Sequence, residues 1–448
     1  MTELSVRPEA APDRFPLSSA QEMWCAGDAA GSFGPRFIMA EALRLRGRID
    51  VAALQAALDD LVVRHEILRT AIVRDVTPPY QSVHPPCPVP LVVRDRPAAP
   101  ADRDRIAAEL ANEAELSTVD VDELPLLRAG LTRFDDEDAV LTLVTHHAAG
   151  DGWSFQLLIR DLAALYLARS TGQPPALPVP RQYRDYAAWE RERRSGSDAE
   201  VLAYWREKLR GAEVFALPTD RPVQKVPQSP YEACNYRFGL DLMEPAAALA
   251  TATRSSVFIV LLAAFDVLAN RITGTTDPVI HALTAGRNQP EFRDTVGPFL
   301  GFLALRTDLG ACGSFRDVVV AARKSLLEAY ANEVPFHRLA RQLPEIMRPL
   351  DDPRMCELIF GFFRPPSLGG QVTIGDDTQP VRQLKQRSTQ IPGGVGWNMG
   401  AGPSGEVFGK VQFNPDEFDE RTMRAWTEEY GRILALATAE PDRDWRDL

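Results

Sequence analysis

The chain carries no excess of basic residues. Of its 448 residues, 50 are Lys or Arg and 62 are Asp or Glu, which gives a formal net charge of −12 and an isoelectric point near 5.2. Contacts to nucleic-acid phosphates need a basic surface, so this composition argues against a nucleic-acid partner. Hydrophobic residues make up 45% and charged residues 25% of the chain, values typical of a folded protein with a sizeable core.

Paired cysteines and long apolar runs are also lacking. The 5 cysteines stand far apart with no CxxC spacing, so we expect free thiols in a reducing, cytoplasmic setting. The first residues do not show the basic and then apolar pattern of a secretory signal. The longest apolar run, 257–269, is interrupted by Asp266 and is shorter than the roughly 20 residues that span a bilayer. We therefore expect no membrane partner.

Helical and strand-like segments alternate along the chain without the strict rhythm of parallel βαβ units. This mixture predicts an α/β protein with mixed α+β layers. Residues 51–64 have apolar side chains at helical spacing after Asp50, a candidate N-cap. The proline-rich stretch 172–180 is typical of a linker, so we expect one lobe at 1–178 and a second at 179–448. Further helices are expected at 105–116, 153–168, 181–194, 198–209, 257–272, 314–331 and 419–437, and strands at 72–73, 81–83, 91–93, 127–134, 139–145, 232–240, 278–283, 301–308, 358–363, 395–399 and 407–413.

The strongest chemical signal is the segment THHAAGDGWS at 145–154, between an apolar strand and a helix. Successive side chains of a strand point to opposite faces, so one of His146 and His147 can face a cavity while the other packs inside. Gly150 and Gly152 permit a tight turn, and N–H groups at a helix start can stabilise developing negative charge. A histidine is a natural base or hydrogen-bond donor near neutral pH.

Three other interpretations of this segment stay open. The histidines can form a buried structural pair, or they can bind a metal together with Asp151. Neighbouring histidines on one strand rarely converge on one ion, and no second Cys/His cluster accompanies them, so we expect no metal. A Ser-His-Asp hydrolase is disfavoured because no GxSxG turn occurs in the chain.

Residues 146–152 also resemble HHxxxDG, the hallmark of the condensation domains of nonribosomal peptide synthetases. Other motifs of that family follow in the family's order along nearly the whole chain. They are SSAQEMW at 18–24, RHEILRT at 64–70, YRDYAAW at 183–189, YW at 204–205, LPTDRP at 217–222, AGRN at 285–288, VGPF at 296–299 and NEVPF at 332–336. The chain departs from the family pattern around 348–354 and at 388–392, two segments that in the family shape the acceptor side.

The resemblance implies two chloramphenicol-acetyltransferase-like lobes that form a V-shaped pseudo-dimer with a central channel. It implies transfer of an amino-acyl or aryl group to an amine or hydroxyl acceptor, forming an amide or an ester in natural-product biosynthesis, enediyne cores included. The donor would arrive on the phosphopantetheine arm of a separate, acyl-loaded peptidyl carrier protein, and the acceptor would be a small molecule or carrier-bound. No carrier-type GGxS site occurs, so we expect a free-standing, monomeric enzyme with no bound cofactor.

The resemblance also assigns roles to residues. His147 and Gly152 would be catalytic, whereas His146, Asp151 and Arg287 would be structural, with Asp151 paired to Arg287. Alternatives are an epimerization-type domain, a carrier-independent coenzyme-A acyltransferase and a non-catalytic recruitment module. Degenerate members of the last kind commonly lose a motif histidine or the glycine, and both are intact here.

Docking of the carrier would need a local basic or apolar patch, because the whole chain is acidic. Candidates are Arg14, Arg36 and the row Arg44, Arg46 and Arg48. The alternative for this row is the solvated face of a strand.

Overall fold

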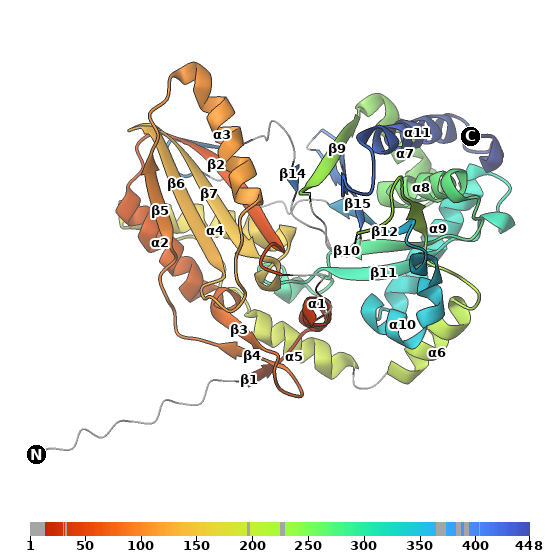
Figure 1. The fold of residues 1–448 in the computed structure, drawn as a ribbon, viewed down its shortest axis with the longest axis horizontal. Helices are drawn as coiled ribbons and strands as arrows, with labels where there is room; N and C mark the ends of the chain where they lie inside the picture. The colour runs from red at the N-terminus through yellow and green to blue at the C-terminus, as the bar shows by residue number, and fades with distance from the viewer. Residues whose placement is uncertain are drawn as a thin grey trace, which may run out of the picture.

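The computed structural model describes residues 14–29, 31, 34–194, 198–224, 229–363, 373–381, 387–388, 394–402 and 404–448. Two lobes of mixed helices and strands stand side by side in a V (Figure 1). The predicted α/β class with mixed layers and two lobes is confirmed. The family departure at 388–392 lies outside the described residues apart from the backbone of Ser388.

The N-terminal lobe is built on a five-stranded sheet in the order β13-β2-β7-β6-β5. Helices α2 and α4 share one hydrophobic cluster with one face of this sheet, and α3 covers the other face. A smaller sheet, β1-β4-β3, lies at the base of the lobe near α1 and α5 (Figure 1). The bounds are β1 Arg14–Pro16, β2 Ile38–Arg46, β3 Thr70–Val73, β4 Tyr80–Val83, β5 Leu91–Asp95, β6 Leu127–Asp135, β7 Asp138–His146, β13 Asp377–Pro380, α1 Ser19–Ala29, α2 Val51–Arg64, α3 Pro100–Glu115, α4 Gly152–Thr171 and α5 Tyr183–Arg194.

Local sequence signals explain where these helices begin. Asp50 caps α2 as predicted, because its Oδ1 accepts hydrogen bonds from the backbone N–H groups of Ala52 (2.9 Å) and Ala53 (3.0 Å). Helix α3 begins at Pro100, earlier than the predicted 105, since proline suits the first helical turn and the opening turns are exposed.

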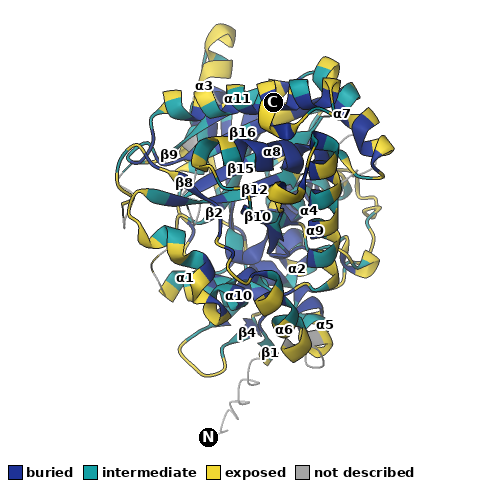
Figure 2. Ribbon diagram, turned by 90° about the vertical axis from the view of Figure 1, so that its right-hand side faces the viewer, coloured by how far each residue is buried: buried dark blue, intermediate teal, exposed yellow. Residues whose placement is uncertain are grey.

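The C-terminal lobe is built on an eight-stranded sheet in the order β11-β10-β12-β15-β16-β9-β14, with β8 paired to β12. Helices α7, α8 and α11 pack on the side of this sheet that points away from the N-terminal lobe (Figure 1). Helix α8 is apolar on all sides and deeply buried, as its sequence predicts (Figure 2). The bounds are β8 Ala216–Pro218, β9 Tyr231–Phe238, β10 Val279–Thr284, β11 Gly301–Arg306, β12 Met355–Phe363, β14 Arg387–Ser388, β15 Val395–Ala401, β16 Val407–Phe413, α6 Asp198–Lys208, α7 Leu240–Ala252, α8 Val257–Thr273, α9 Phe315–Ala331, α10 Phe336–Gln342 and α11 Glu420–Ala439.

Several segments cross between the lobes. Strand β13 comes from the second half of the chain but pairs with β2 of the first lobe. Tyr183, Phe292 and Phe299 join the hydrophobic cluster of the N-terminal lobe. The core of the N-terminal lobe thus includes residues from both sides of position 178/179, so the two cores do not divide there. The domain boundary itself stays a prediction.

The row Arg44, Arg46 and Arg48 is not a continuous solvated face. Arg44 is buried under α3 and holds Asp138 in an ion pair, with Nη2 donating to Oδ2 at 2.6 Å. Arg46 donates to the same oxygen at 2.6 Å. Both interpretations of the row are therefore wrong for Arg44, because α3 covers this face of β2. Arg14, Arg36 and Arg48 stay exposed.

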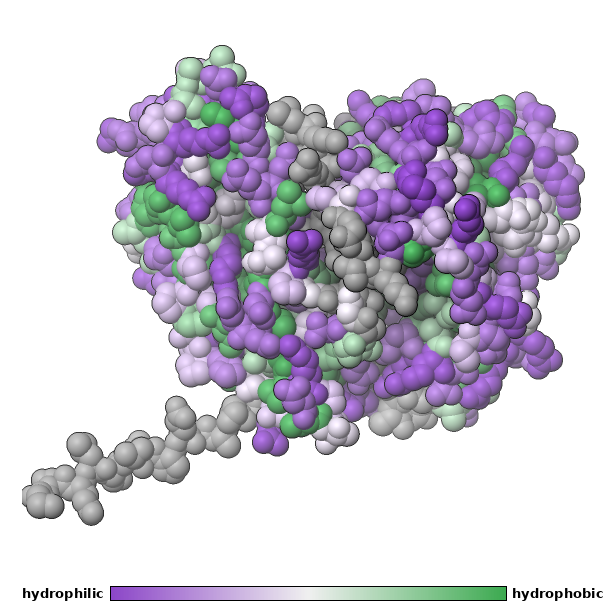
Figure 3. Space-filling view, in the orientation of Figure 1, coloured by the Kyte–Doolittle hydropathy of each residue, from purple (hydrophilic) through white to green (hydrophobic). Residues whose placement is uncertain are grey.

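All five cysteines are free, as predicted. Among the described residues no single helix is long and apolar enough to cross a membrane, and α7 with α8 passes such a test only as a pair bent by 104°. On the face drawn in Figure 3, apolar side chains lie in small groups among hydrophilic ones.

Asp266 is a buried carboxyl group inside α8, and within the described part of the chain neither of its oxygens has a hydrogen-bond partner. Burial raises its pKa well above the ordinary value, so the folded chain holds it protonated. The unfolded chain releases that proton above about pH 4, which lowers the free energy of unfolding by up to ~1.4 kcal/mol per pH unit as pH rises. We expect Asp266→Asn to be more stable than wild type at pH 8, with a smaller difference at pH 5. Thermal unfolding at both pH values checks this, and an unchanged pH dependence in the variant would contradict it.

Candidate active site

The segment 146–152 forms a tight loop between β7 and α4. His146 ends β7, where it lies opposite Ile38 of β2. A short 3-10 turn, His147–Ala149, follows, and Asp151 is the N-cap residue of α4. The two histidines therefore stand at the end of a central strand and at the start of the turn.

His146 is fully buried and both of its ring nitrogens are used inside the protein. Its Nδ1 accepts a hydrogen bond from the N–H of Ala148 (3.0 Å), and its Nε2 lies 3.2 Å from the carbonyl oxygen of Gly34, to which it donates. The edge of Trp24 packs against the ring. Burial lowers the pKa of His146 to about 4, so the ring is neutral. This environment fits the structural role expected for His146, which stays a prediction.

His147 is half-buried and oriented differently. Its Nδ1 lies 3.1 Å from the carbonyl oxygen of Gly150, and its ring stacks on Phe37 with centroids 4.4 Å apart. Because a carbonyl only accepts, Nδ1 carries the proton and Nε2 carries a lone pair. Burial lowers the pKa of His147 below its ordinary value, which keeps this ring neutral at pH 7. A neutral imidazole with a free lone pair can accept a proton from a nucleophile.

Asp151 holds the loop through three hydrogen bonds. It accepts from the N–H of Ser154 at 2.7 Å, from the N–H of Phe299 at 3.1 Å and from Nη2 of Arg287 at 3.2 Å. The last two partners come from the second half of the chain. The ion pair between Asp151 and Arg287 that the family resemblance implies is therefore present. It links the loop to a segment from the second half of the chain.

Arg287 is buried, with 2% of its side chain exposed. It donates to the carbonyl oxygens of Phe292 (3.1 Å) and Thr295 (2.8 Å) and to Oγ of Ser154 (2.7 Å). The ring of Phe299 lies 3.9 Å from its guanidinium carbon. One arginine therefore fixes the segment after β10 and the first turn of α4 together.

Two glycines allow this close approach. Gly286 has φ +62°, and a Cβ there would lie 2.0 Å from the carbonyl oxygen of Phe299. A Cβ on Gly297 would lie 1.9 Å from the ring of Tyr183. The motifs at 183–189, 285–288 and 296–299 thus meet around Asp151, although nothing in their spacing indicates which of them contact one another.

Gly152 is exposed at the start of α4, and a Cβ there would meet no described atom within 4 Å. The fold itself does not require glycine at this position, so the catalytic role that the family resemblance implies for Gly152 stays a prediction. We expect Gly152→Ala to keep the melting temperature and to lower kcat/KM by about 10²-fold, the cost of a displaced reactant. Unchanged turnover in this variant would contradict a catalytic role for Gly152.

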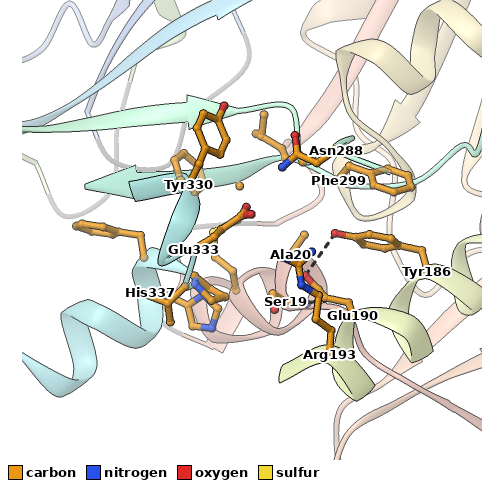
Figure 4. A pocket seen from close by; sticks show the side chains of 18 of the residues that line it. Ser19, Ala20, Tyr186, Glu190, Arg193, Asn288, Phe299, Tyr330, Glu333 and His337 are labelled. Atoms are coloured by element: carbon orange, nitrogen blue, oxygen red, sulfur yellow. Dashed lines mark hydrogen bonds between the residues drawn. The ribbon is translucent and has the colours of Figure 1, made fainter. Parts of the chain in front are cut away.

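A cavity opens between α1, α5 and α10 (Figure 4). Glu190 of α5 is held there by the N–H of Ser19 (2.8 Å) and the hydroxyl of Tyr186 (3.4 Å). Gly286 and Phe299 also line this cavity, so it reaches the segments that bind Asp151. His147 is not among the lining residues. The remaining labelled side chains in Figure 4 are Ala20, Arg193, Asn288, Tyr330, Glu333 and His337.

Sequence reasoning missed several partners of the loop. Ser154 lies in the quoted segment, but nothing in its local pattern marks its hydrogen bonds to Arg287 and Gly297. Phe37, which supports the ring of His147, belongs to no motif. The VGPF motif at 296–299 was the available signal for Phe299.

Comparisons with known proteins identify the relatives of this chain. A family model described as "Condensation domain" matches residues 12–355. A linear gramicidin synthase protein of Brevibacillus parabrevis is 33% identical over 407 residues, which are 90% of this chain and 8% of that protein. The chain spans less than a tenth of the length of the first curated relatives that it matches.

Two solved structures are similar over nearly the whole chain. The SgcC5 protein from Streptomyces globisporus, crystallised with (R)-(-)-1-(2-naphthyl)-1,2-ethanediol and sucrose, is 38% identical with a TM-score of 0.85, and the match covers 96% of this chain and 100% of that one. The complex of the X-domain and OxyB from teicoplanin biosynthesis contains a chain that is 25% identical with a TM-score of 0.80, covering 100% of this chain and 98% of that one.

Proposed function

The chain belongs to the condensation-domain family, and we propose that it transfers an acyl group from a carrier-protein thioester to an amine or hydroxyl acceptor. Amide-forming condensation in nonribosomal peptide synthesis is the general activity of this family, and its fold is the two-lobed, chloramphenicol-acetyltransferase-like one. The carrier, the acceptor and the ester product belong to the proposal.

The observation that carries the proposal is the state of His147. Its Nδ1–H is bound to Gly150, so the Nε2 lone pair is the position that can receive a proton. The acceptor nitrogen or oxygen attacks the thioester carbonyl, and a C–N or C–O bond forms as the C–S bond breaks. The proton lost by the nucleophile passes to Nε2 and then to the departing pantetheine sulfur. In this proposal His147 acts as the general base, a role that contributes roughly 10²–10⁴-fold to the rate.

The donor would enter between the lobes on the side of the cavity of Figure 4, which reaches the segments that bind Asp151 but not His147 itself, with the carrier resting outside. The phosphopantetheine arm belongs to that carrier, and the chain itself keeps no cofactor. Helices α1 and α10 stand on two sides of this opening, and Arg338 of α10 lies 3.5 Å from Glu22 of α1. Enclosure between the lobes would keep bulk water away from a reactive thioester. Net charge does not attract an acidic carrier to a chain at −12, so docking would depend on local contacts.

A hydroxyl acceptor is supported by one comparison. The SgcC5 protein is crystallised with an aryl-substituted vicinal diol, and this chain shares 38% identity with it. An alcohol needs proton removal more than a neutral amine does, which suits a neutral His147. The product would then be an ester.

The test follows product by mass spectrometry. One acyl group is offered on a peptidyl carrier protein and on coenzyme A, with 1-(2-naphthyl)-1,2-ethanediol and its amino-alcohol analogue as acceptors. We expect product from the carrier-bound donor, and product formation about 10²–10⁴-fold slower with His147→Ala. If acyl-coenzyme A reacts as fast as the carrier-bound donor, the proposed carrier dependence is wrong and the chain acts as a coenzyme-A acyltransferase.

A recruitment module is the second candidate, because the similar X-domain is found in a complex with OxyB. His146, His147, Asp151 and Gly152 are all present here, which favours catalysis. Failure of every donor and acceptor pair, together with stable binding of a separate partner protein such as OxyB, would favour recruitment.

A further inference from the structure

The large sheet of the C-terminal lobe has two unlike faces. Trp397 of β15 and Val411 of β16 are fully buried on the helix-covered face, where Trp397 packs against Phe265 of α8 at 5.2 Å. Their neighbours Asn398 and Lys410 point the opposite way and are only half-buried. This second face looks toward the N-terminal lobe (Figure 1).

Charged groups locate this second face beside the other lobe. Lys410 interacts electrostatically with Glu41 of β2 and Glu115 at the end of α3. Burial lowers the pKa of Lys410 and raises that of Glu41 to about 7, as expected for groups enclosed between two bodies. The second face therefore borders the space between the lobes.

Three residues form one row across this face. Phe363 of β12 lies opposite Gly400 of β15, and Gly400 lies opposite Phe408 of β16. Residues in such a row point to the same side of the sheet. Phe363 is 40% and Phe408 49% exposed, and they are the only exposed phenylalanines in the part of the chain that the structure describes.

The position above Gly400 is free of described side chains. A Cβ on Gly400 would meet only the carbonyl oxygen of Phe363, at an ordinary 3.5 Å. The flanking rings lean away from it, since a Cβ on Gly361 would lie 3.2 Å from the ring of Phe363 and one on Gly402 would lie 2.8 Å from the ring of Phe408. The fold therefore does not need glycine at 400, and the missing side chain leaves room between the two rings, next to Asn398 and Lys410.

The row lies at the edge of the sheet that leads to the active site. Strands β10 and β12 run parallel, with Ala282 opposite Phe360. Continuing that register places Phe363 level with Ala285, two residues before Arg287, which binds Asp151. The free position above Gly400 is thus on the same edge as the loop that carries His147.

We propose that Gly400, flanked by Phe363 and Phe408, seats a flat, unsaturated ring of the acceptor. This inference rests on the proposed function, because it assigns the occupant as the acceptor of that reaction. Strands are about 4.8 Å apart, so the two phenylalanines stand on strands about 9.6 Å apart with an empty position between them. A planar ring can lie over Gly400 with one phenylalanine ring near each of its ends, whereas a puckered aliphatic ring packs less closely there.

Binding of the free acceptor probe tests the seat without any donor. The probes are 1-(2-naphthyl)-1,2-ethanediol and 1-cyclohexyl-1,2-ethanediol, titrated calorimetrically into the full-length protein. We expect wild type to bind the naphthyl diol at least tenfold more tightly. Gly400→Val fills the seat with a side chain that suits a strand, and it should weaken naphthyl binding at least tenfold with little change for the cyclohexyl diol. Phe408→Ala should weaken naphthyl binding three- to tenfold.

Leu327→Ala is the matched control, because Leu327 is 55% exposed on α9 and does not belong to the row. It should bind both probes as wild type does. The seat is wrong if wild type binds the two probes equally or binds neither of them. It is also wrong if Gly400→Val and Phe408→Ala both keep the wild-type affinity for the naphthyl diol. His147→Ala should bind the naphthyl diol normally and form product about 10²–10⁴-fold more slowly. If wild type shows the expected probe binding but transfers no acyl group, the proposed function is wrong and the seat stands. If wild type transfers the acyl group but does not show the expected probe binding, the seat is wrong and the proposed function stands.

Discussion

His147→Ala should lower kcat/KM by about 10²–10⁴-fold while the protein stays folded. The ring is half-buried, stacks on Phe37 and makes one hydrogen bond through Nδ1, to Gly150, so its removal leaves the hydrogen bonds of Asp151 and Arg287 in place. The substitution removes the group that we propose receives the proton of the nucleophile. Steady-state kinetics with a carrier-bound donor, alongside thermal unfolding, measures both effects. A folded variant with full turnover would refute the assignment.

The pH profile gives the same test a second readout. The pKa of His147 is lowered by burial, so the base stays unprotonated from neutral pH down to below its ordinary range. Wild-type kcat/KM should therefore fall only on the acid side of that ordinary range, and the fall should be missing from the residual activity of His147→Ala. His146→Ala is the matched control: its ring is enclosed by Gly34 and Ala148, so its loss should reduce soluble yield more than the activity of the folded fraction.

Elements with local signals were predictable from the sequence. Helix α2 has Asp50 at its start and an apolar face at helical spacing, and the structure gives it the predicted bounds. The hairpin of β6 and β7 turns at the acidic residues Asp136 and Glu137, and this polar turn between two apolar strands predicts its position. Helix α8 is apolar on every side and was expected to be buried.

Elements defined by distant partners were not predictable. Strand β13 has the sequence DTQP, which shows no strand pattern, and it exists because β2 offers a free edge. Helix α7 contains Pro245, a residue that argues against a helix, yet Met243, Ala246 and Leu249 are buried against the core. Tertiary packing outweighs local preference in both.

The candidate site shows the same division. Residues 146–152 form one local turn, so their importance could be read from the sequence. The environment of each histidine could not, because it depends on Gly34, Phe37 and Trp24, which come from other segments. The pairing of Asp151 with Arg287 was available only through resemblance to a family, since 136 positions separate the two residues.

Arg287→Ala should destabilise the protein by about 3–5 kcal/mol, the usual cost of removing one partner of a buried ion pair. The loss would leave Asp151 as an uncompensated buried charge and would remove the donor from Phe292, Thr295 and Ser154 together. Arg287→Lys should recover only part of this energy, because an ammonium group cannot reproduce the planar fork that reaches four acceptors. Denaturant unfolding of both variants measures the difference.

Asp151→Asn separates structure from chemistry at the same pair. The amide oxygen can still accept from the N–H of Ser154 or of Phe299, whereas the charge that faces Arg287 is gone. We expect a lower melting temperature with turnover reduced in proportion to the loss of folded protein. The double variant with Arg287→Met should be destabilised by less than the sum of the two single variants, since each single change strands its partner and the double change strands neither. Loss of turnover at an unchanged melting temperature would mean that the carboxylate takes part in the reaction, and Asp151 would then be a catalytic residue rather than the group that holds the loop.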